Sequence, residues 1–250
     1  PFRLGAASVL GGLLALGGCG GSSSATSALP ARAGTVQVRF IEGAPSLEAL
    51  VGGVPTDIGA AYLSVNRTTV ASSFPYGTTT QFFPFSAGTL SLEALDSLGY
   101  SVGPLNSPVL AAGKRYTLAL VGAYGAYRVL AFEEPQTRGA ALAVYAASPA
   151  LPSADFGSFR ASNRSNFKKL ASVRFGNVAT VALGASVSNF GAYVGTGVTP
   201  VPNGAITVQS VDSFDSRNAL PFHDGARLSL FLFDPRAGSS NGPVFGSLDL

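Results

Sequence analysis

The chain carries a single histidine, a single cysteine and 13 carboxylates, and these residues define the chemistry that it could perform. His223 precedes Asp224, and this pair is where a histidine relay would have to begin. A Ser-His-Asp triad is defined by geometry that spacing alone does not give. Ser186 lies in Gly-Ala-Ser-Val-Ser and not in a Gly-x-Ser-x-Gly elbow. We therefore interpret His223 as a loop residue and expect no catalytic residue and no enzyme activity.

The carboxylates show no recognisable metal-binding or catalytic pattern. Asp212 and Asp215 lie close together, but the Asp-x-Asp-x-Asp-Gly loop of a calcium site is absent. Glu133 and Glu134 end a strand before a proline, which indicates a solvated strand end. Two carboxylates far apart in the sequence could still hydrolyse a glycoside, so that alternative stays open. One cysteine and one histidine exclude Cys-cluster and multi-His sites, no phosphate-binding loop is present, and we expect no metal and no cofactor.

The one cysteine ends a short apolar segment near the start of the sequence. An arginine precedes an apolar run of 11 residues, 6–16. This run is too short for a bilayer span of about 20 residues, and it has the length of a signal-peptide core. It ends in Leu-Gly-Gly-Cys at 16–19, which resembles the lipobox of bacterial lipoproteins. The resemblance implies cleavage between Gly18 and Cys19 and transfer of a diacylglycerol to the Cys19 thiolate, so residues 1–18 are predicted to be a lipoprotein signal peptide.

Residues 19–34 are rich in Gly, Ser and Ala and almost uncharged, which is typical of a flexible tether. Its reach of about 20 Å would lift a folded domain off a membrane surface. A lipidated Cys19 makes the membrane the first predicted partner. Gly20 stands where an Asp would indicate inner-membrane retention in enteric-type bacteria. The outer membrane or cell surface is therefore favoured if the organism has two membranes.

From residue 35 onward the sequence has the pattern of short strands separated by turns. In segments 35–42, 89–95, 115–121 and 127–134, apolar residues recur at every second position. In the first of these, Val36, Val38 and Phe40 alternate with Gln37, Arg39 and Ile41. This period of two indicates strands, and 31 Gly with 16 Pro oppose long helices. The sequence predicts an all-β fold.

The second half of the sequence repeats the layout of the first. LAVYAASP echoes VRFIEGAP at an offset of 104 residues, Phe175-Gly176 echoes Tyr76-Gly77 at 99, and GARLSLFLF echoes GKRYTLALV at 112. Copies of about 100 residues suit sandwiches of immunoglobulin size. We predict two tandem immunoglobulin-like or transthyretin-like β-sandwich domains, residues 35–135 and 140–250, after the signal peptide and the tether.

Several elements of the first copy resemble domain of unknown function family 4397. They are VRFIEGAP (38–45), YLSVNRTTV (62–70), PYGTTT (75–80), SAGTLSLEA (86–94) and AAGKRYTLALVG (111–122). The resemblance covers residues 36–135 and, more loosely, 140–250. It departs from the family pattern at Glu42, where the family has a histidine. Members are mostly bacterial, secreted or lipid-anchored, and often carry the domain in tandem. The family has no established activity, so the resemblance implies fold and location without implying a ligand.

Charge and aromatic content narrow the remaining function classes. The net charge is +3, and the only adjacent basic pairs are Lys114-Arg115 and Lys168-Lys169. We interpret this as scattered charge that lacks the basic face of a nucleic-acid binder, and expect no nucleic-acid partner. The 17 Phe and 8 Tyr could include rings that bind a sugar or a peptide. Core packing is the preferred interpretation, since apolar residues at strand spacing usually form the core.

These observations predict a lipid-anchored protein of a bacterial cell envelope with a structural, adhesive or ligand-binding role. Its expected partners are the membrane, through the anchor, and a glycan or protein ligand. The alternative is a secreted, envelope-associated hydrolase that acts on polysaccharide or cell-wall material. The two hypotheses differ in what they require, because a hydrolase needs a cleft lined by acidic residues.

Overall fold

The structure, a computed structural model, consists of β-strands joined by turns and loops. It describes residues 34–45, 50–51, 54–55, 62–95, 101–122, 126–137, 139–160, 163–182, 189–193, 227–234 and 244–249. These residues form 17 strands and contain no α-helix. The prediction of an all-β fold is therefore confirmed. The predicted signal peptide and tether lie outside the described residues.

The first half of the chain folds into a sandwich of two four-stranded sheets. One has the order β10-β9-β1-β6, formed by Arg128–Glu133, Arg115–Val121, Thr35–Glu42 and Phe83–Ser86. The other has the order β5-β4-β7-β8, formed by Thr68–Ala71, Tyr62–Val65, Ser91–Leu95 and Ser101–Asn106. Strands β2 (Leu50–Val51) and β3 (Val54–Pro55) pair with each other outside both sheets. Between the two sheets, alternate apolar residues such as Val38, Phe40 and Leu63 form a buried core.

The second half forms a sandwich of related layout. Its inner sheet has the order β14-β11-β16-β17, formed by Val178–Ala182, Ala141–Ala146, Arg227–Leu232 and Val244–Asp249. Its outer sheet has the order β13-β12-β15, formed by Asn163–Arg174, Ser153–Arg160 and Asn189–Tyr193. Leu142, Phe156 and Leu230 belong to the core between these sheets. The prediction of two tandem β-sandwiches is confirmed.

Equivalent backbone hydrogen bonds relate the two sandwiches. The Gly77 amide donates to the Glu42 carbonyl at 2.7 Å, and the Gly176 amide donates to the Ala146 carbonyl at 2.8 Å. These pairs differ by 99 and 104 residues, the offsets by which the sequence repeats. Both glycines have positive φ, +80° and +78°, which glycine adopts without a steric penalty.

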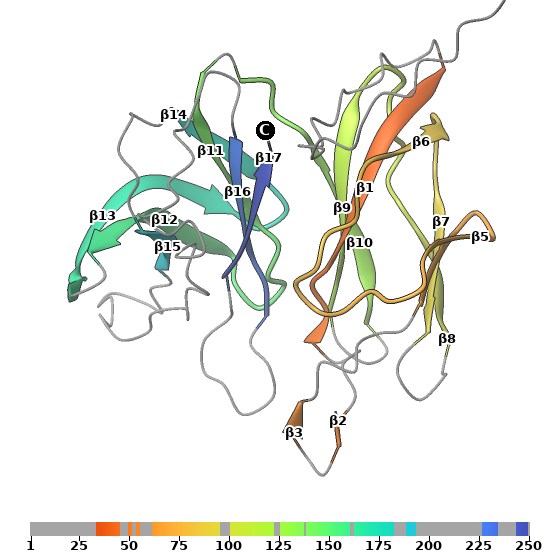
Figure 1. Cartoon of the computed structure of the whole chain (residues 1–250), viewed down its shortest axis with the longest axis horizontal. Helices are drawn as coiled ribbons and strands as arrows, with labels where there is room; N and C mark the ends of the chain where they lie inside the picture. Colours follow the sequence, from red (N-terminus) through yellow and green to blue (C-terminus); the bar gives the residue numbers. More distant parts are fainter. Residues whose placement is uncertain are drawn as a thin grey trace, which may run out of the picture.

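The two sandwiches pack against each other through their inner sheets, so that four sheets are stacked in consecutive layers (Figure 1). A third apolar core lies between the inner sheets and draws on both halves. Its buried members are Ile41, Tyr76, Ala119, Val121, Phe132, Ala143, Tyr145, Ala147, Phe231, Phe233 and Phe245. This packing gives each inner sheet two covered faces.

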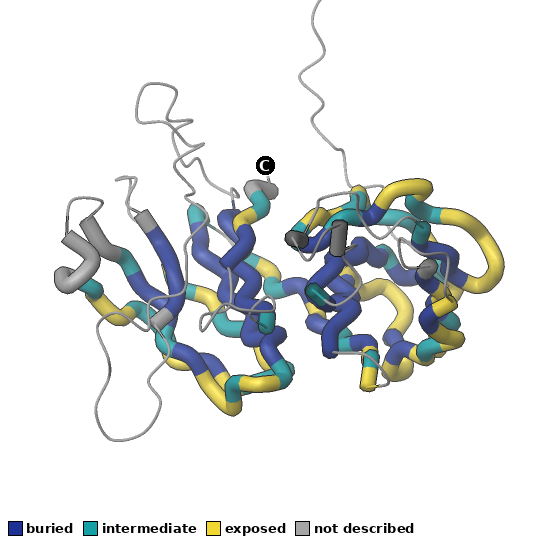
Figure 2. Tube along the Cα trace, turned by 90° about the horizontal axis from the view of Figure 1, so that it is seen from below, coloured by how far each residue is buried: buried dark blue, intermediate teal, exposed yellow. Residues whose placement is uncertain are grey.

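Burial on both faces explains the composition of the inner strands. Every residue of β11 and β16 is buried, and so are six of the seven residues of β9 (Figure 2). Within each inner sheet the two central strands are parallel, β1 with β9 and β11 with β16. Parallel strands covered on both sides read as continuous apolar runs, as ALAVYA of β11 does. Strands β9 and β16 depart from such a run at Thr117, Arg227 and Ser229, which are buried polar residues.

Candidate functional site: a buried charged cluster between the sandwiches

Most residues that the sequence offered for chemistry lie outside the described part of the chain. They are Gly18, Cys19, Ser186, Asp212, Asp215, His223 and Asp224. Lipidation at Cys19 and the loop interpretation of His223 therefore stay predictions. Within the described ranges, no three His, Cys, Asp or Glu side chains lie close enough to hold a metal ion. The same ranges hold no helix with the length and apolar character of a membrane span.

The adjacent acids Glu133 and Glu134 occupy opposite environments. Glu133 is half exposed and pairs with Lys114 at 2.7 Å, as expected of a solvated strand end. Glu134 is buried, with a side chain that is 2% exposed. The interpretation of both residues as a solvated end is therefore wrong for Glu134. Its side chain points into the space between the sandwiches, where the second sandwich excludes water.

Glu134 lies at the centre of a cluster of polar side chains from both sandwiches. Arg39 approaches Glu134 Oε1 at 3.3 Å, and Arg227 pairs with Oε2 from the opposite sandwich. Thr117 donates a hydrogen bond to Oε1, and the Tyr145 hydroxyl lies 3.3 and 3.2 Å from the two oxygens. Removing a carboxylate from water is costly unless it is paired and hydrogen-bonded, and here both oxygens have partners.

Arg39 reaches the cluster because of its place on β1. Val38 and Phe40 point into the first sandwich, so the alternate residues Arg39 and Ile41 point toward the second. Arg39 Nε donates to Thr117 Oγ1 at 2.7 Å, and Arg39 Nη2 lies 3.3 Å from Ser229 Oγ across the interface.

Two aromatic rings also enclose the Arg39 guanidinium. Its central carbon lies 5.1 Å from the Phe82 ring centre and 5.7 Å from that of Phe231. Cation–π contacts of this kind strengthen when water is excluded. Arg39 therefore contacts strand β9 and the second sandwich at the same time.

Tyr145 contributes a neutral donor. Burial, and next the charge of Glu134, raise the pKa of the Tyr145 hydroxyl well above its usual value of 10.0. The hydroxyl therefore keeps its proton in the folded protein at neutral pH. Its ring stacks on Phe231 at a centroid distance of 4.3 Å and meets Phe132 edge to face at 5.3 Å.

Two glycines let aromatic rings of the second sandwich approach the backbone of the first. A Cβ at Gly43 would lie 2.2 Å from the Phe233 ring, and a Cβ at Gly77 would lie 2.2 Å from the Phe245 ring. Tyr76, beside Gly77, packs edge to face on Phe245 and donates its hydroxyl proton to the Asp234 carbonyl at 2.8 Å. The interpretation of the aromatic residues as core is confirmed here, in a core that joins the two sandwiches.

The arrangement as a whole joins the inner sheets of the two sandwiches. Arg227 completes the cluster by donating to the Pro135 carbonyl at 3.0 Å, which fixes the segment that connects the sandwiches. Buried ion pairs add little net stability against apolar residues, but they penalise any arrangement that leaves one charge unpaired. The cluster therefore specifies how the sandwiches dock. The sequence signal that could have revealed the covered face was the lack of a polar face in β11, ALAVYA.

Comparisons with known proteins add little to this picture. No protein-family model and no curated protein matches the chain, so the resemblance to family 4397 stays a prediction. Among solved structures, the chain is similar to CBMbc, a family CBM26 module from Eubacterium rectale Amy13K in complex with maltoheptaose. The identity is 10%, the TM-score is 0.25, and the match covers 85% of this chain and 97% of that chain. A TM-score this low carries no argument about fold or ligand.

Proposed function

We propose that this chain is a non-catalytic, lipid-anchored protein of a bacterial cell envelope that presents a rigid ligand-binding head on a flexible tether. The observation that supports the proposal best is the buried cluster around Glu134. In this cluster three buried ionic side chains, Arg39, Glu134 and Arg227, join the two sandwiches. A head of this kind holds its outer faces in a fixed relation, which suits adhesion or ligand binding.

The position of each outer sheet also supports a binding role. One face of each inner sheet is buried in the core of its own sandwich, and the other face is buried in the interface between the sandwiches. The outer sheets and their loops are therefore the surfaces that a partner can reach. A β-sandwich that offers its outer surface for recognition needs no cleft. A hydrolase would need convergent acidic residues in a cleft. Among the described acids, Glu133, Glu134 and Asp155 each pair with a basic residue. Two others accept hydrogen bonds within the fold: Glu42 from the Ala44 amide, and Asp234 from Ser148 and the Ala150 amide.

One experiment tests binding and catalysis together. The full-length chain, purified in detergent, is incubated with immobilised envelope polysaccharides and peptidoglycan, and both retained protein and released sugar are measured. We expect retention without release. Release of reducing ends or peptide stems that depends on the protein would overturn the proposal and favour the hydrolase.

The anchor has its own test. In a bacterial host, Cys19→Ala should abolish incorporation of labelled palmitate and move the protein out of the detergent phase, because the thiolate that accepts the lipid is gone. Unchanged labelling and membrane partition in the variant would show that Cys19 is not the anchor.

A further inference from the structure

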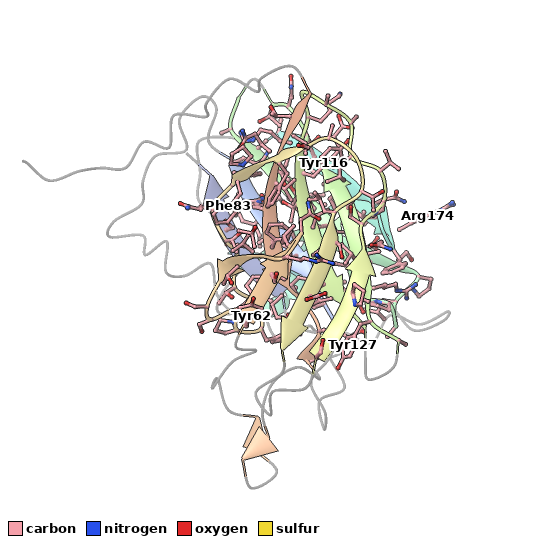
Figure 3. All side chains as sticks on the ribbon, turned by 90° about the vertical axis from the view of Figure 1, so that its right-hand side faces the viewer. Tyr62, Phe83, Tyr116, Tyr127 and Arg174 are labelled. Carbon is pink, nitrogen blue, oxygen red and sulfur yellow. The ribbon has the colours of Figure 1, made fainter. Side chains whose placement is uncertain are left out.

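Strand β13 and the end of β12 carry a dense positive charge that adjacency counts alone did not reveal. Residues 160–174 contain five of the chain's 16 Lys and Arg residues and no acid. They are Arg160, Arg164, Lys168, Lys169 and Arg174. Antiparallel pairing with β12 places β13 at the edge of its sheet. Lys168, Lys169 and Arg174 are exposed, and Figure 3 shows Arg174 extending away from the ribbon.

An aromatic ring lies beside these cations. Ala154 and Phe156 of β12 point into the core, so Asp155 and Gly157 face outward. A Cβ at Gly157 would lie 2.1 Å from the Lys168 carbonyl oxygen and 2.8 Å from Phe167 Cζ. The glycine therefore makes room for the β13 backbone and for the tip of the Phe167 ring. The Phe167 side chain is half buried, so part of it is accessible from outside the sheet.

A carboxylate completes the surface. Asp155 Oδ2 lies 3.5 Å from Lys169 Nζ, and Asp155 Oδ1 accepts a hydrogen bond from Ser172. Both members of the ion pair are partly exposed, with side chains 57% exposed for Lys169 and 36% for Asp155. An exposed pair of this kind is weak in water, so each partner can exchange it for a ligand at small cost. In the register of β12 with β13, Gly157 pairs with Lys169 and Ser153 with Arg174, so these two cations share the outward face with Asp155. We define the β12–β13 face by Asp155, Gly157, Phe167, Lys169 and Arg174.

We propose that the β12–β13 face binds an anionic polysaccharide, which gives the ligand class for the binding role and rests on that proposed function. The Phe167 ring can pack on the C–H face of a sugar, as aromatic side chains pack on apolar surfaces. Lys169 and Arg174 supply charge-assisted hydrogen bonds to carboxylate or phosphate groups along the polymer. Asp155 can accept hydrogen bonds from sugar hydroxyl groups.

The observations favour a polysaccharide over a membrane surface as the occupant. Binding to a bilayer interface combines charge with apolar side chains that enter the lipid. Among the described residues, the large apolar side chain that is fully exposed is Val109, and it belongs to the first sandwich. On the β12–β13 face the apolar ring is half buried against Gly157, so the charged and polar groups of this face suit a hydrated anionic polymer better than the interior of a bilayer.

The test compares two variants that remove the same charge from different sandwiches. Full-length protein in detergent is titrated with polygalacturonate, with neutral dextran, and with vesicles that contain phosphatidylglycerol. The site variant is Lys169→Gln with Arg174→Gln. The matched control is Arg67→Gln with Lys114→Gln, which removes two exposed charges from the first sandwich. A further variant, Phe167→Ala, removes the ring and keeps the charge.

We expect polygalacturonate to bind, and its Kd to rise at least about tenfold in the site variant and at most about twofold in the control, since each lost charge contact costs about a factor of several. Phe167→Ala should raise the Kd severalfold even at high salt, where screening has weakened the ionic contacts. Dextran should bind much more weakly than polygalacturonate. These results together would support the site and its ligand class.

Other outcomes separate this inference from the proposed function. Equal effects of the site and control variants would show nonspecific charge attraction and overturn the inference. Site-dependent binding to vesicles in place of polygalacturonate would replace the polysaccharide with a lipid surface. Binding of a neutral envelope polysaccharide, unaffected by the site variant, would overturn the inference and leave the proposed binding role intact. Retention on no envelope component would overturn both.

Discussion

At the interface between the sandwiches, the first sandwich presents small side chains where the second presents aromatic rings. Under the offsets of the repeat, Ala119 corresponds to Phe231 and Val121 to Phe233, and all four are buried in the shared core. Gly43 and Gly77 of the first sandwich lie directly beneath rings of the second. The two faces therefore complement each other and are not copies of each other.

The equivalent turns at Gly77 and Gly176 share their backbone conformation but differ in what packs against them. Both glycines have nearly identical φ, and both donate to the end of the first strand of their sandwich. A side chain at Gly77 would strike the Phe245 ring, whereas nothing lies within 4 Å of a Cβ at Gly176. The backbone at both positions is set by the repeat. The surroundings differ because only Gly77 lies under the partner's ring.

The comparison shows that the residues shared by the two copies specify the fold of each sandwich, whereas the residues that differ between the copies specify how the two sandwiches dock. Self-pairing of either inner sheet would place ring on ring or leave gaps between small residues, and both packing faults are destabilising. The charged cluster also favours docking of the first sandwich on the second over self-pairing of either one. Glu134 of the connecting segment needs a cation from each sandwich, Arg39 from the first and Arg227 from the second.

The adjacent acids provide the largest expected contrast. Glu134→Ala leaves two guanidinium groups buried without their carboxylate, and we expect the free energy of unfolding to fall by about 3–5 kcal/mol. Glu133→Ala removes a half-exposed partner of Lys114 and should change stability much less, because water screens that pair. Urea denaturation of both variants measures the contrast. Similar losses from both would mean that the cluster does not contribute to docking as described.

The two glycines test the ring contact directly. Gly176→Ala adds only the backbone cost of a positive φ, about 1–2 kcal/mol. Gly77→Ala adds the same cost and must also displace the Phe245 ring, so we expect a further loss of about 1–3 kcal/mol. Thermal or urea unfolding of the pair separates the two contributions. If Gly77→Ala were no worse than Gly176→Ala, the close packing of Phe245 on this turn would be disproved.

A smaller effect is expected from the buried tyrosine. Tyr145→Phe keeps the stacked ring and removes the hydroxyl that contacts both oxygens of Glu134, at an expected cost of about 1–2 kcal/mol at neutral pH. Because Phe132 lies beside the same ring, Phe132→Leu is a control that changes packing without touching the hydrogen bonds. Wild-type stability of Tyr145→Phe would show that the Tyr145 hydroxyl does not stabilise the buried Glu134 carboxylate.

Alkaline pH should bring the wild type and Tyr145→Phe closer together. The raised pKa of Tyr145 means that the folded state keeps a proton that the unfolded chain loses near pH 10. The stability from this group is therefore complete below pH 10 and declines as the pH rises beyond it. Unfolding free energies of both proteins at pH 8 and pH 11 measure the decline. A constant difference between them at the two pH values would contradict the buried, neutral hydroxyl.

The least effect is expected at the exposed ion pair. Lys114→Gln removes the partner of Glu133, whose hydrogen bond raises the Lys114 pKa. Because the pair is exposed, we expect no measurable change in the urea midpoint at physiological salt. A clear fall in the urea midpoint of Lys114→Gln would show that this exposed ion pair stabilises the protein, contrary to the prediction.

The sequence predicted the local structure well and the environment of its polar residues poorly. Alternation in β1 identified the strand and the inward position of Val38 and Phe40. The same alternation left Arg39 on the opposite face, and nothing in a strand pattern says what covers that face. Glu134, two residues from a glutamine in a proline-containing turn, reads as solvated because its partner Arg227 is distant in sequence.

A continuous apolar strand was the available signal for the interface. Ala141–Ala146 lacks the polar face of an exposed strand, and such a run is typical of a strand covered on both sides. The interpretation of the charge as scattered missed the β12–β13 face for a related reason. It considered neighbouring residues in the chain, while an antiparallel hairpin gathers residues that are several positions apart.

The parallel pairing of β1 with β9, and of β11 with β16, has a consequence for how quickly the native state can form. Arg39 and Thr117, on the first pair, are 78 residues apart, and Arg39 and Ser229, across the interface, are 190 residues apart. Chains dominated by such nonlocal contacts fold slowly, because distant segments must meet before the contacts stabilise them. During synthesis, the first sandwich would expose its apolar docking face until residues near 230 had emerged. Exposed apolar strands can aggregate during such an interval. A chaperone that holds the unfinished chains apart from one another should therefore raise the yield of folded protein.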